Sequence, residues 1–134
     1  MPNRILKESI CTSDTINELS PEMESLFYRL LVQCDDFGRF DARPSIVRSR
    51  CYPLKLEKVN EKTILSWLNK LAEVELIKFY IIDHHPYLLI TKWEKHQQIR
   101  AKKSKYPEPD NICNQLLVSC LRNMLTKSFN LLQN

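Results

Sequence analysis

Glycine is the residue that this chain uses least, with one, Gly38, among 134 residues. A phosphate-binding P-loop needs two glycines and a dinucleotide-binding fingerprint needs three, because the backbone must approach phosphate where no side chain fits. The single glycine therefore excludes both kinds of nucleotide site.

Long apolar segments and paired cysteines are also missing. No uninterrupted apolar run exceeds about five residues, whereas a membrane helix requires roughly 20. The five cysteines form no Cys-x-x-Cys motif, which argues against a zinc knuckle or a redox pair. The first residues lack the apolar segment of a secretory signal. We therefore expect a cytoplasmic protein with no membrane span, no metal site and no cofactor.

Positive charge is concentrated in two separate blocks. The net charge is +4, but residues 37–62 hold seven basic and three acidic residues, and residues 92–105 hold six basic residues and one acidic. Residues 1–36, by contrast, hold three basic and seven acidic residues. Basic blocks favour a polyanionic partner, because phosphate contacts release counterions and charge steers the encounter. The alternative is that these blocks are solvated surface.

Three helices are predicted from apolar residues at spacings of three and four and from residues that cap helix ends. The first begins at Ser20, the second near Pro44, and the third is capped by Asn60. A tight turn at Gly38 and a short extended segment at 39–41 separate the first two. The predicted ranges are 44–51 for the second helix and 61–73 for the third.

Two β-rich runs, 76–82 and 87–91, follow the third helix. The polar connection 83–86 between them is typical of a hairpin. The order of helix, short strand, helix, helix and hairpin is that of a winged helix-turn-helix, a mainly α fold with a small β-hairpin.

The C-terminal part of the chain has a different pattern. Pro107 and Pro109 interrupt helix formation, and apolar pairs recur every four residues beyond them, which predicts an amphipathic helix at 111–132. We expect a DNA-binding domain with a basic extension at 1–106 and a linker with this tail helix at 107–134. The tail helix can pack back on the domain or pair between chains, and we favour pairing, which would give a homo-oligomer.

Four separated passages carry a family resemblance: NRILKESICTSD at 3–14, CDDFGRFDARP at 34–44, WEKHQ at 93–97 and RAKKSKYP at 100–107. Together they resemble the N-terminal winged-helix domain of phage and prophage replication proteins, the replisome organisers or DnaD-like initiators. The resemblance covers about residues 3–109. It implies DNA binding during replication initiation, no catalysis, and replication proteins of the host or phage as further partners.

In a winged helix the third helix enters the major groove, where side chains can read base edges. The face of this helix that points away from its apolar stripe carries Lys62, Ser66, Asn69 and Lys70, which we expect to contact DNA. Because Glu73 shares the face and it holds only two lysines, a merely solvated face is the alternative.

Phosphate contacts are expected from both basic blocks. Arg43, Arg48 and Arg50 surround the second helix and can donate two hydrogen bonds each to phosphate. The basic residues of 92–105 are interleaved with Trp93 and His96 and followed by Tyr106, which suits phosphate contact and base stacking. The alternative is a solubilising linker. The basic residues expected to contact DNA there are Lys95, Arg100, Lys102, Lys103 and Lys105.

The sequence indicates no catalytic arrangement and no enzyme. No Ser/His/Asp or Cys/His pairing is signalled, and Asp35 and Asp36 beside Gly38 indicate a turn rather than an acid/base pair. Trp93 is expected in the core under the hairpin. The predicted function is a non-catalytic DNA-binding protein of phage or prophage origin in replication initiation. A winged-helix transcriptional regulator and a protein-interaction module of a replisome are the alternatives.

Overall fold

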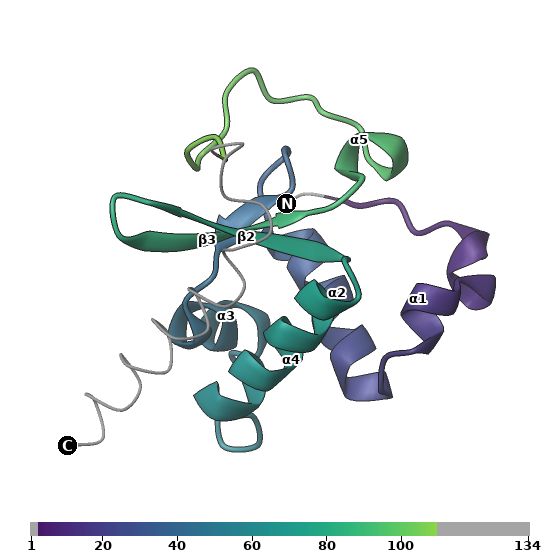
Figure 1. Cartoon of the computed structure of the whole chain (residues 1–134), viewed down its shortest axis with the longest axis vertical. Coiled ribbons are helices and arrows are strands. Elements are labelled where there is room, and N and C mark those ends of the chain that lie inside the picture. Colours follow the sequence, from purple (N-terminus) through teal and green to yellow (C-terminus); the bar gives the residue numbers. More distant parts are fainter. Residues whose placement is uncertain (1–2, 110–134) are drawn as a thin grey trace.

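The computed structural model describes residues 3–109, and the predicted tail helix at 111–132 lies outside them. Within that range the chain is mixed α/β, with five α-helices, a short 3-10 helix and a three-stranded antiparallel sheet, a layout compatible with a winged helix (Figure 1). In chain order the elements are η1 (Glu8–Thr12), α1 (Asp14–Asn17), α2 (Pro21–Gln33), β1 (Arg39–Asp41), α3 (Pro44–Cys51), α4 (Glu61–Glu73), β2 (Ile77–Ile82), β3 (His85–Ile90) and α5 (Trp93–His96).

The predicted helix caps are confirmed. The Ser20 hydroxyl accepts a hydrogen bond from the amide of Met23, and Pro21 follows as the first residue of α2. The side-chain oxygen of Asn60 accepts one from the amide of Thr63, at 2.8 Å, in the first turn of α4. Each bond satisfies an amide that has no partner within its helix, so both helices begin where the sequence predicts.

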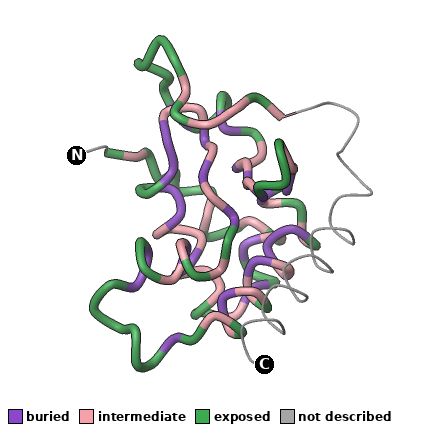
Figure 2. Tube along the Cα trace, turned by 90° about the vertical axis from the view of Figure 1, so that its left-hand side faces the viewer, coloured by how far each residue is buried: buried purple, intermediate pink, exposed green. Residues whose placement is uncertain are grey.

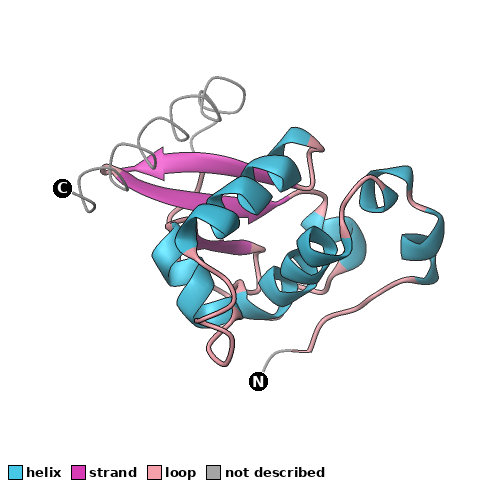
Figure 3. Cartoon of the chain, turned by 90° about the horizontal axis from the view of Figure 1, so that it is seen from below, coloured by secondary structure: helices cyan, strands magenta, loops and turns pink. Residues whose placement is uncertain are grey.

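The sheet has the order β1-β3-β2, and β1 pairs with β3 rather than standing apart from the hairpin. Phe40 lies opposite Leu88, which in turn lies opposite Phe79. All three side chains are at most 2% exposed and belong to the core that α2, α3 and α4 share with the sheet. Figure 3 shows the three strands side by side with the helices grouped against them.

The hairpin turn is shorter than the sequence predicts. Asp83 and His84 alone connect the strands, both with positive φ (50° and 67°), and His85 and Pro86 already belong to β3. Two positive φ values in succession give the backbone twist that matches a two-residue hairpin. The prediction of a four-residue connection at 83–86 is therefore wrong, because His85 and Pro86 pair with Ile82 and Ile81 and the Pro86 carbonyl accepts the amide of Ala42.

The face of the sheet opposite the helices is covered in part by residues that the sequence predicts as a linker. Tyr106 packs against Phe40 and Tyr87, with 6.1 Å between ring centroids in each pair. The hydroxyl of Tyr80, a residue only 1% exposed, donates to the carbonyl of Pro107 at 2.9 Å. The packed structure thus continues past residue 106. Within residues 3–109, no helix is long and apolar enough to cross a membrane.

Candidate nucleic-acid interface

Residues 97–107, which we call the strap, leave α5 and cross the top of the molecule in Figure 1. Two carboxylates at the end of α2 hold the strap by its backbone. Asp36 accepts the amides of Arg100 and Ala101, at 2.9 and 2.8 Å. Asp35 accepts the amide of Lys105, at 3.1 Å, and the hydroxyl of Ser104. The strap is therefore fixed on both sides of Lys102 and Lys103.

The Asp35 carboxylate also shapes the turn that the sequence predicts. The second oxygen of Asp35 accepts the amides of Phe37 and Arg39, at 2.9 and 3.0 Å, and Gly38 adopts a φ of +77°. A Cβ atom on Gly38 would lie 2.8 Å from the ring of Trp93. The one glycine of the chain thus occupies a position that needs both a positive φ and the absence of a side chain.

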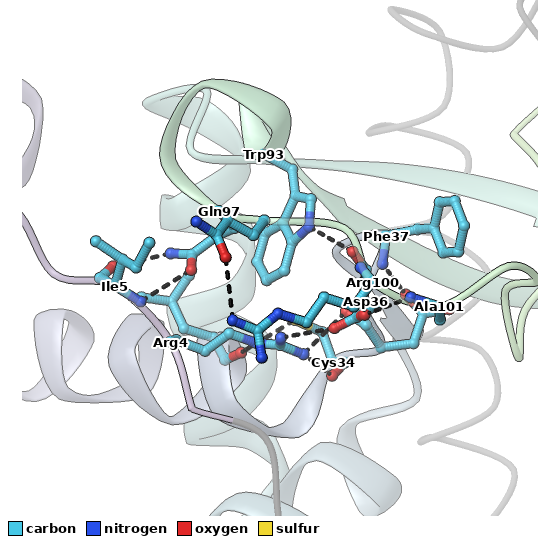
Figure 4. Close-up of polar contacts among 12 residues, drawn as sticks. Arg4, Ile5, Cys34, Asp36, Phe37, Trp93, Gln97, Arg100 and Ala101 are labelled. Atoms are coloured by element: carbon cyan, nitrogen blue, oxygen red, sulfur yellow. Dashed lines mark hydrogen bonds and ion pairs between the residues drawn. The ribbon is translucent and has the colours of Figure 1, made fainter.

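Arg4 joins the N-terminal segment to the end of α2 (Figure 4). Its side chain is 6% exposed and donates to the carbonyls of Leu31 (2.8 Å), Cys34 (3.0 Å) and Asp35 (3.2 Å) and to the Asp36 carboxylate (3.0 Å). Its guanidinium also lies 5.0 Å from the centroid of a Trp93 ring. Arg4 thereby satisfies carbonyls at the end of α2 that have no helical partner and neutralises Asp36.

Gln97 and Trp93 complete this cluster. The Gln97 amide makes two hydrogen bonds with the backbone of Ile5, at 2.9 and 2.8 Å. Trp93, 4% exposed, donates its indole N–H to the Asp36 carbonyl at 2.7 Å, which confirms its place in the core. We call Arg4, Asp35, Asp36, Trp93 and Gln97 the clasp. The four passages that carry the family resemblance, at 3–14, 34–44, 93–97 and 100–107, all contribute to the clasp or to the strap backbone that it holds.

Because the clasp contains the ionised carboxylate of Asp36, we expect the free energy of unfolding to depend on pH. The amide of Arg100, the Arg4 guanidinium and the amide of Ala101 all hydrogen-bond to Asp36, which lowers its pKa below the ordinary value of 3.8. A carboxyl with a lowered folded-state pKa stabilises the fold above its unfolded pKa, and this contribution disappears as pH falls through the folded pKa. Asp36→Asn is therefore expected to destabilise the protein at neutral pH and to lose this difference from the parent at an acidic pH below the lowered pKa of Asp36. Urea unfolding of both chains at the two pH values measures this, and a difference that does not change with pH would contradict it.

The strap lysines are the candidate residues that are most available to a ligand. Lys102, Lys103 and Lys105 are exposed, and among residues 3–109 they have no ion-pair partner. Lys95 and Arg100 are exposed as well; the Lys95 carbonyl accepts from Lys7, and the Arg100 guanidinium donates to Gln98 at 3.2 Å.

The three arginines around α3 have three different environments. Arg43 forms a two-pronged ion pair with Asp41, with the shortest N–O distance at 2.7 Å, and this pair raises its pKa. Arg48 donates to the carbonyls of Val59, at 2.7 Å, and of Leu56, which fixes the loop between α3 and α4. Arg50 is exposed, and no hydrogen bond or ion pair joins it to another residue of the described range.

Tyr106 links Arg50 to the strap. Burial and the charge of Asp35 raise the pKa of the Tyr106 hydroxyl, while the positive charge of Arg50 lowers it, so Arg50 lies near this ring. Tyr106 follows Lys105 directly. Arg50 and the strap lysine Lys105 are thus both neighbours of Tyr106.

The predicted α4 residues lie apart from the strap. Lys62 and Ser66 are exposed, and Asn69 and Lys70 are half-buried, with Lys70 3.8 Å from Glu73. These four share the side of α4 that faces away from its buried residues Ile64, Leu68, Leu71 and Ala72. Figures 1 and 2 place the strap and the α3–α4 loop at opposite ends of the molecule, and both are exposed (green in Figure 2). The candidates therefore form two surfaces.

Two cysteines of the described range, Cys34 and Cys51, are buried. Burial raises the pKa of the Cys34 and Cys51 thiols to about 12, which keeps them protonated and poorly nucleophilic. Within residues 3–109, no three His, Cys, Asp or Glu side chains are grouped so that they could hold a metal ion. Comparisons of the chain with protein-family models, with curated proteins and with solved structures find no match.

Proposed function

We propose that this chain is a non-catalytic DNA-binding protein with a winged-helix fold. One observation carries the proposal: the strap holds three exposed lysines without ion-pair partners in the described residues, while the clasp fixes the backbone beside them. Cations held in place on a rigid backbone lose little conformational freedom when they contact phosphate. A solubilising linker would need no such anchoring.

The order of elements supports the same function. Helices α2, α3 and α4 with the β2–β3 hairpin follow the winged helix-turn-helix order, in which α4 is the helix that enters the major groove. Asn69 and Ser66 on α4 are then the residues that would read base edges. Arg50 and the strap lysines would contact the backbone and position the protein.

The role in replication initiation, and the phage or prophage source, are supported by the four passages that resemble replisome organisers. A transcriptional regulator with the same fold would differ in the DNA that it prefers. Binding to a replication-origin duplex compared with an operator duplex distinguishes the two roles.

The expected result for the proposal is a steep salt dependence of duplex binding. Fluorescence anisotropy of a labelled mixed-sequence duplex, measured across a salt series, is expected to give a logarithm of affinity that falls linearly with the logarithm of salt concentration, by about 0.9 for each phosphate contact. Absence of binding at low salt, or an affinity that salt does not change, would contradict the proposal.

A further inference from the structure

A cleft of about 700 Å³ lies on the side of the sheet that the strap borders. Residues of the N-terminal segment, α2, the end of α4, the sheet, α5 and the strap line it, including Ile99 within the strap and Pro109 just beyond it. The charged side chains in its lining are mainly cationic: Lys7, Arg39, Lys78 and Lys92, with Glu75 and Glu94 as the carboxylates.

A row of residues crosses the sheet inside this cleft. Leu89 on β3 lies opposite Arg39 on β1 and opposite Lys78 on β2. Since directly paired residues project from the same face of a sheet, the three side chains form a line of cation, apolar residue and cation. Neighbouring strands lie about 4.8 Å apart, so the two cations are roughly 10 Å apart at the backbone.

Arg39 has hydrogen-bonding capacity that the described residues do not use. Its Nε is buried and has no hydrogen-bond partner, and its Nη1 makes one long bond, of 3.4 Å, to the Tyr106 carbonyl. Within residues 3–109, no carboxylate lies within ion-pair distance of Arg39. A partly buried guanidinium without an anion is costly, and an anionic ligand would relieve that cost.

The cleft also offers an aromatic surface beside this cation. The Arg39 guanidinium lies 5.3 Å from the centroid of the half-buried Phe37 ring, which lines the cleft together with Leu89 and Ile99. Cations that alternate with aromatic and apolar side chains suit unpaired nucleotides, since the phosphates meet the charges and the exposed bases meet the rings. The bases of a duplex are stacked inside the helix and are not available to such a surface.

We propose that this cleft binds a short unpaired stretch of DNA, with phosphates on Arg39 and Lys78 and a base against Phe37. The inference rests on the proposed function, because the strap that borders the cleft is the segment that grips duplex DNA. It assigns the strand-separated part of a DNA site to the cleft and the duplex part to the strap and α4.

A 5′-phosphorylated thymidine tetranucleotide tests the inference, with binding measured by fluorescence anisotropy. Arg39→Gln is expected to weaken its binding at least tenfold, about the loss of one charged hydrogen bond. Lys78→Gln, at an exposed strand position that should not disturb folding, is expected to weaken it at least threefold. Lys58→Gln removes the same charge from the α3–α4 loop and is expected to leave tetranucleotide binding at the parent level.

Duplex binding by the same variants separates the two proposals. Arg39→Gln and Lys78→Gln are expected to bind duplex like the parent. If the parent, Arg39→Gln and Lys78→Gln bind the tetranucleotide with equal affinity, the cleft assignment is wrong. The proposed function would be unaffected by that result as long as the parent binds duplex. Tetranucleotide binding that is lost in Lys102→Gln/Lys103→Gln but kept in Arg39→Gln would place the single strand on the strap and also overturn it. If the parent does not bind duplex but binds the tetranucleotide, and Arg39→Gln weakens that binding, the proposed function is wrong. The assignment of the cleft to single-stranded DNA would then still stand.

Discussion

Replacing Arg4 with alanine is expected to lower the free energy of unfolding by about 2–4 kcal/mol, because it removes several hydrogen bonds of a largely buried guanidinium, one of them to a partly exposed carboxylate. The Arg4 side chain is 6% exposed, and the substitution leaves Asp36 without its cation. It also removes one hydrogen bond from each of the carbonyls of Leu31, Cys34 and Asp35, of which those of Leu31 and Asp35 keep a second donor in Cys34 Sγ and the Gly38 amide. Because Asp36 also holds the strap, the loss should reach both the N-terminal segment and residues 100–101.

Lys7→Ala provides the matched control for this prediction. Lys7 belongs to the same N-terminal segment but is exposed, and its amine donates a hydrogen bond of 2.9 Å to the Lys95 carbonyl. Its removal is expected to cost less than about 1 kcal/mol. Urea unfolding of both variants measures the difference. A loss for Arg4→Ala as small as that for Lys7→Ala would show that the clasp does not stabilise the fold.

The second large effect is expected from Leu68 at the centre of α4. Leu68 is fully buried, and Leu68→Ala should destabilise the protein by about 2–5 kcal/mol through lost burial and the cavity left behind. The neighbouring Asn69 is half-buried, and within residues 3–109 no hydrogen bond of its side chain is seen. Asn69→Ala should therefore change stability by less than about 0.5 kcal/mol.

The same pair separates folding from DNA reading. If α4 enters the major groove, Asn69→Ala should lose up to about 1–3 kcal/mol of discrimination at one base pair, with adenine as the best geometric partner of asparagine. Melting curves and titrations with duplexes that vary one base at a time give both quantities. If Asn69→Ala binds every duplex with the affinity of the parent, Asn69 does not contact a base edge. An unchanged melting curve for Leu68→Ala would contradict the place of Leu68 in the core.

The sequence predicts α2, α3 and α4 well because their signals are local, whereas the short helices η1, α1 and α5 are not predicted. Ser20 and Asn60 cap helices within three residues of themselves, and the positive φ of Gly38 follows from its own lack of a side chain. The length of the hairpin turn is not predicted correctly, because the polar residues at 83–86 do not show where strand pairing begins. Pairing depends on the partner strand, here through the Pro86 carbonyl and Ala42.

The clasp could not be predicted, because its contacts join residues far apart in the chain. Arg4 meets Asp36 across 32 positions, and Ile5 meets Gln97 across 92. The signals that the sequence does contain are three cations, one of them Arg4, in the mainly acidic block 1–36 and the adjacent aspartates Asp35 and Asp36. Neither feature says which residue meets which.

Whether a charged side chain is free to contact a ligand also depends on tertiary contacts. The sequence treats Arg43, Arg48 and Arg50 alike, yet Asp41 pairs with the first and loop carbonyls bind the second. Arg50 alone of the three is left exposed without such a partner in the described range. The proposed interface therefore rests on Arg50 and the strap more than on Arg43 or Arg48.

The measurement that tests the central claim most directly is the salt dependence of duplex binding by two matched double variants. Lys102→Gln/Lys103→Gln removes two charges from the strap, and Lys55→Gln/Lys58→Gln removes two from the exposed α3–α4 loop at the other end of the molecule. We expect the strap variant to bind every duplex more weakly and to lose up to about 0.9 of the salt slope for each phosphate contact removed. The loop variant should stay close to the parent. Equal slopes and affinities for the two variants would contradict the claim that the strap grips DNA.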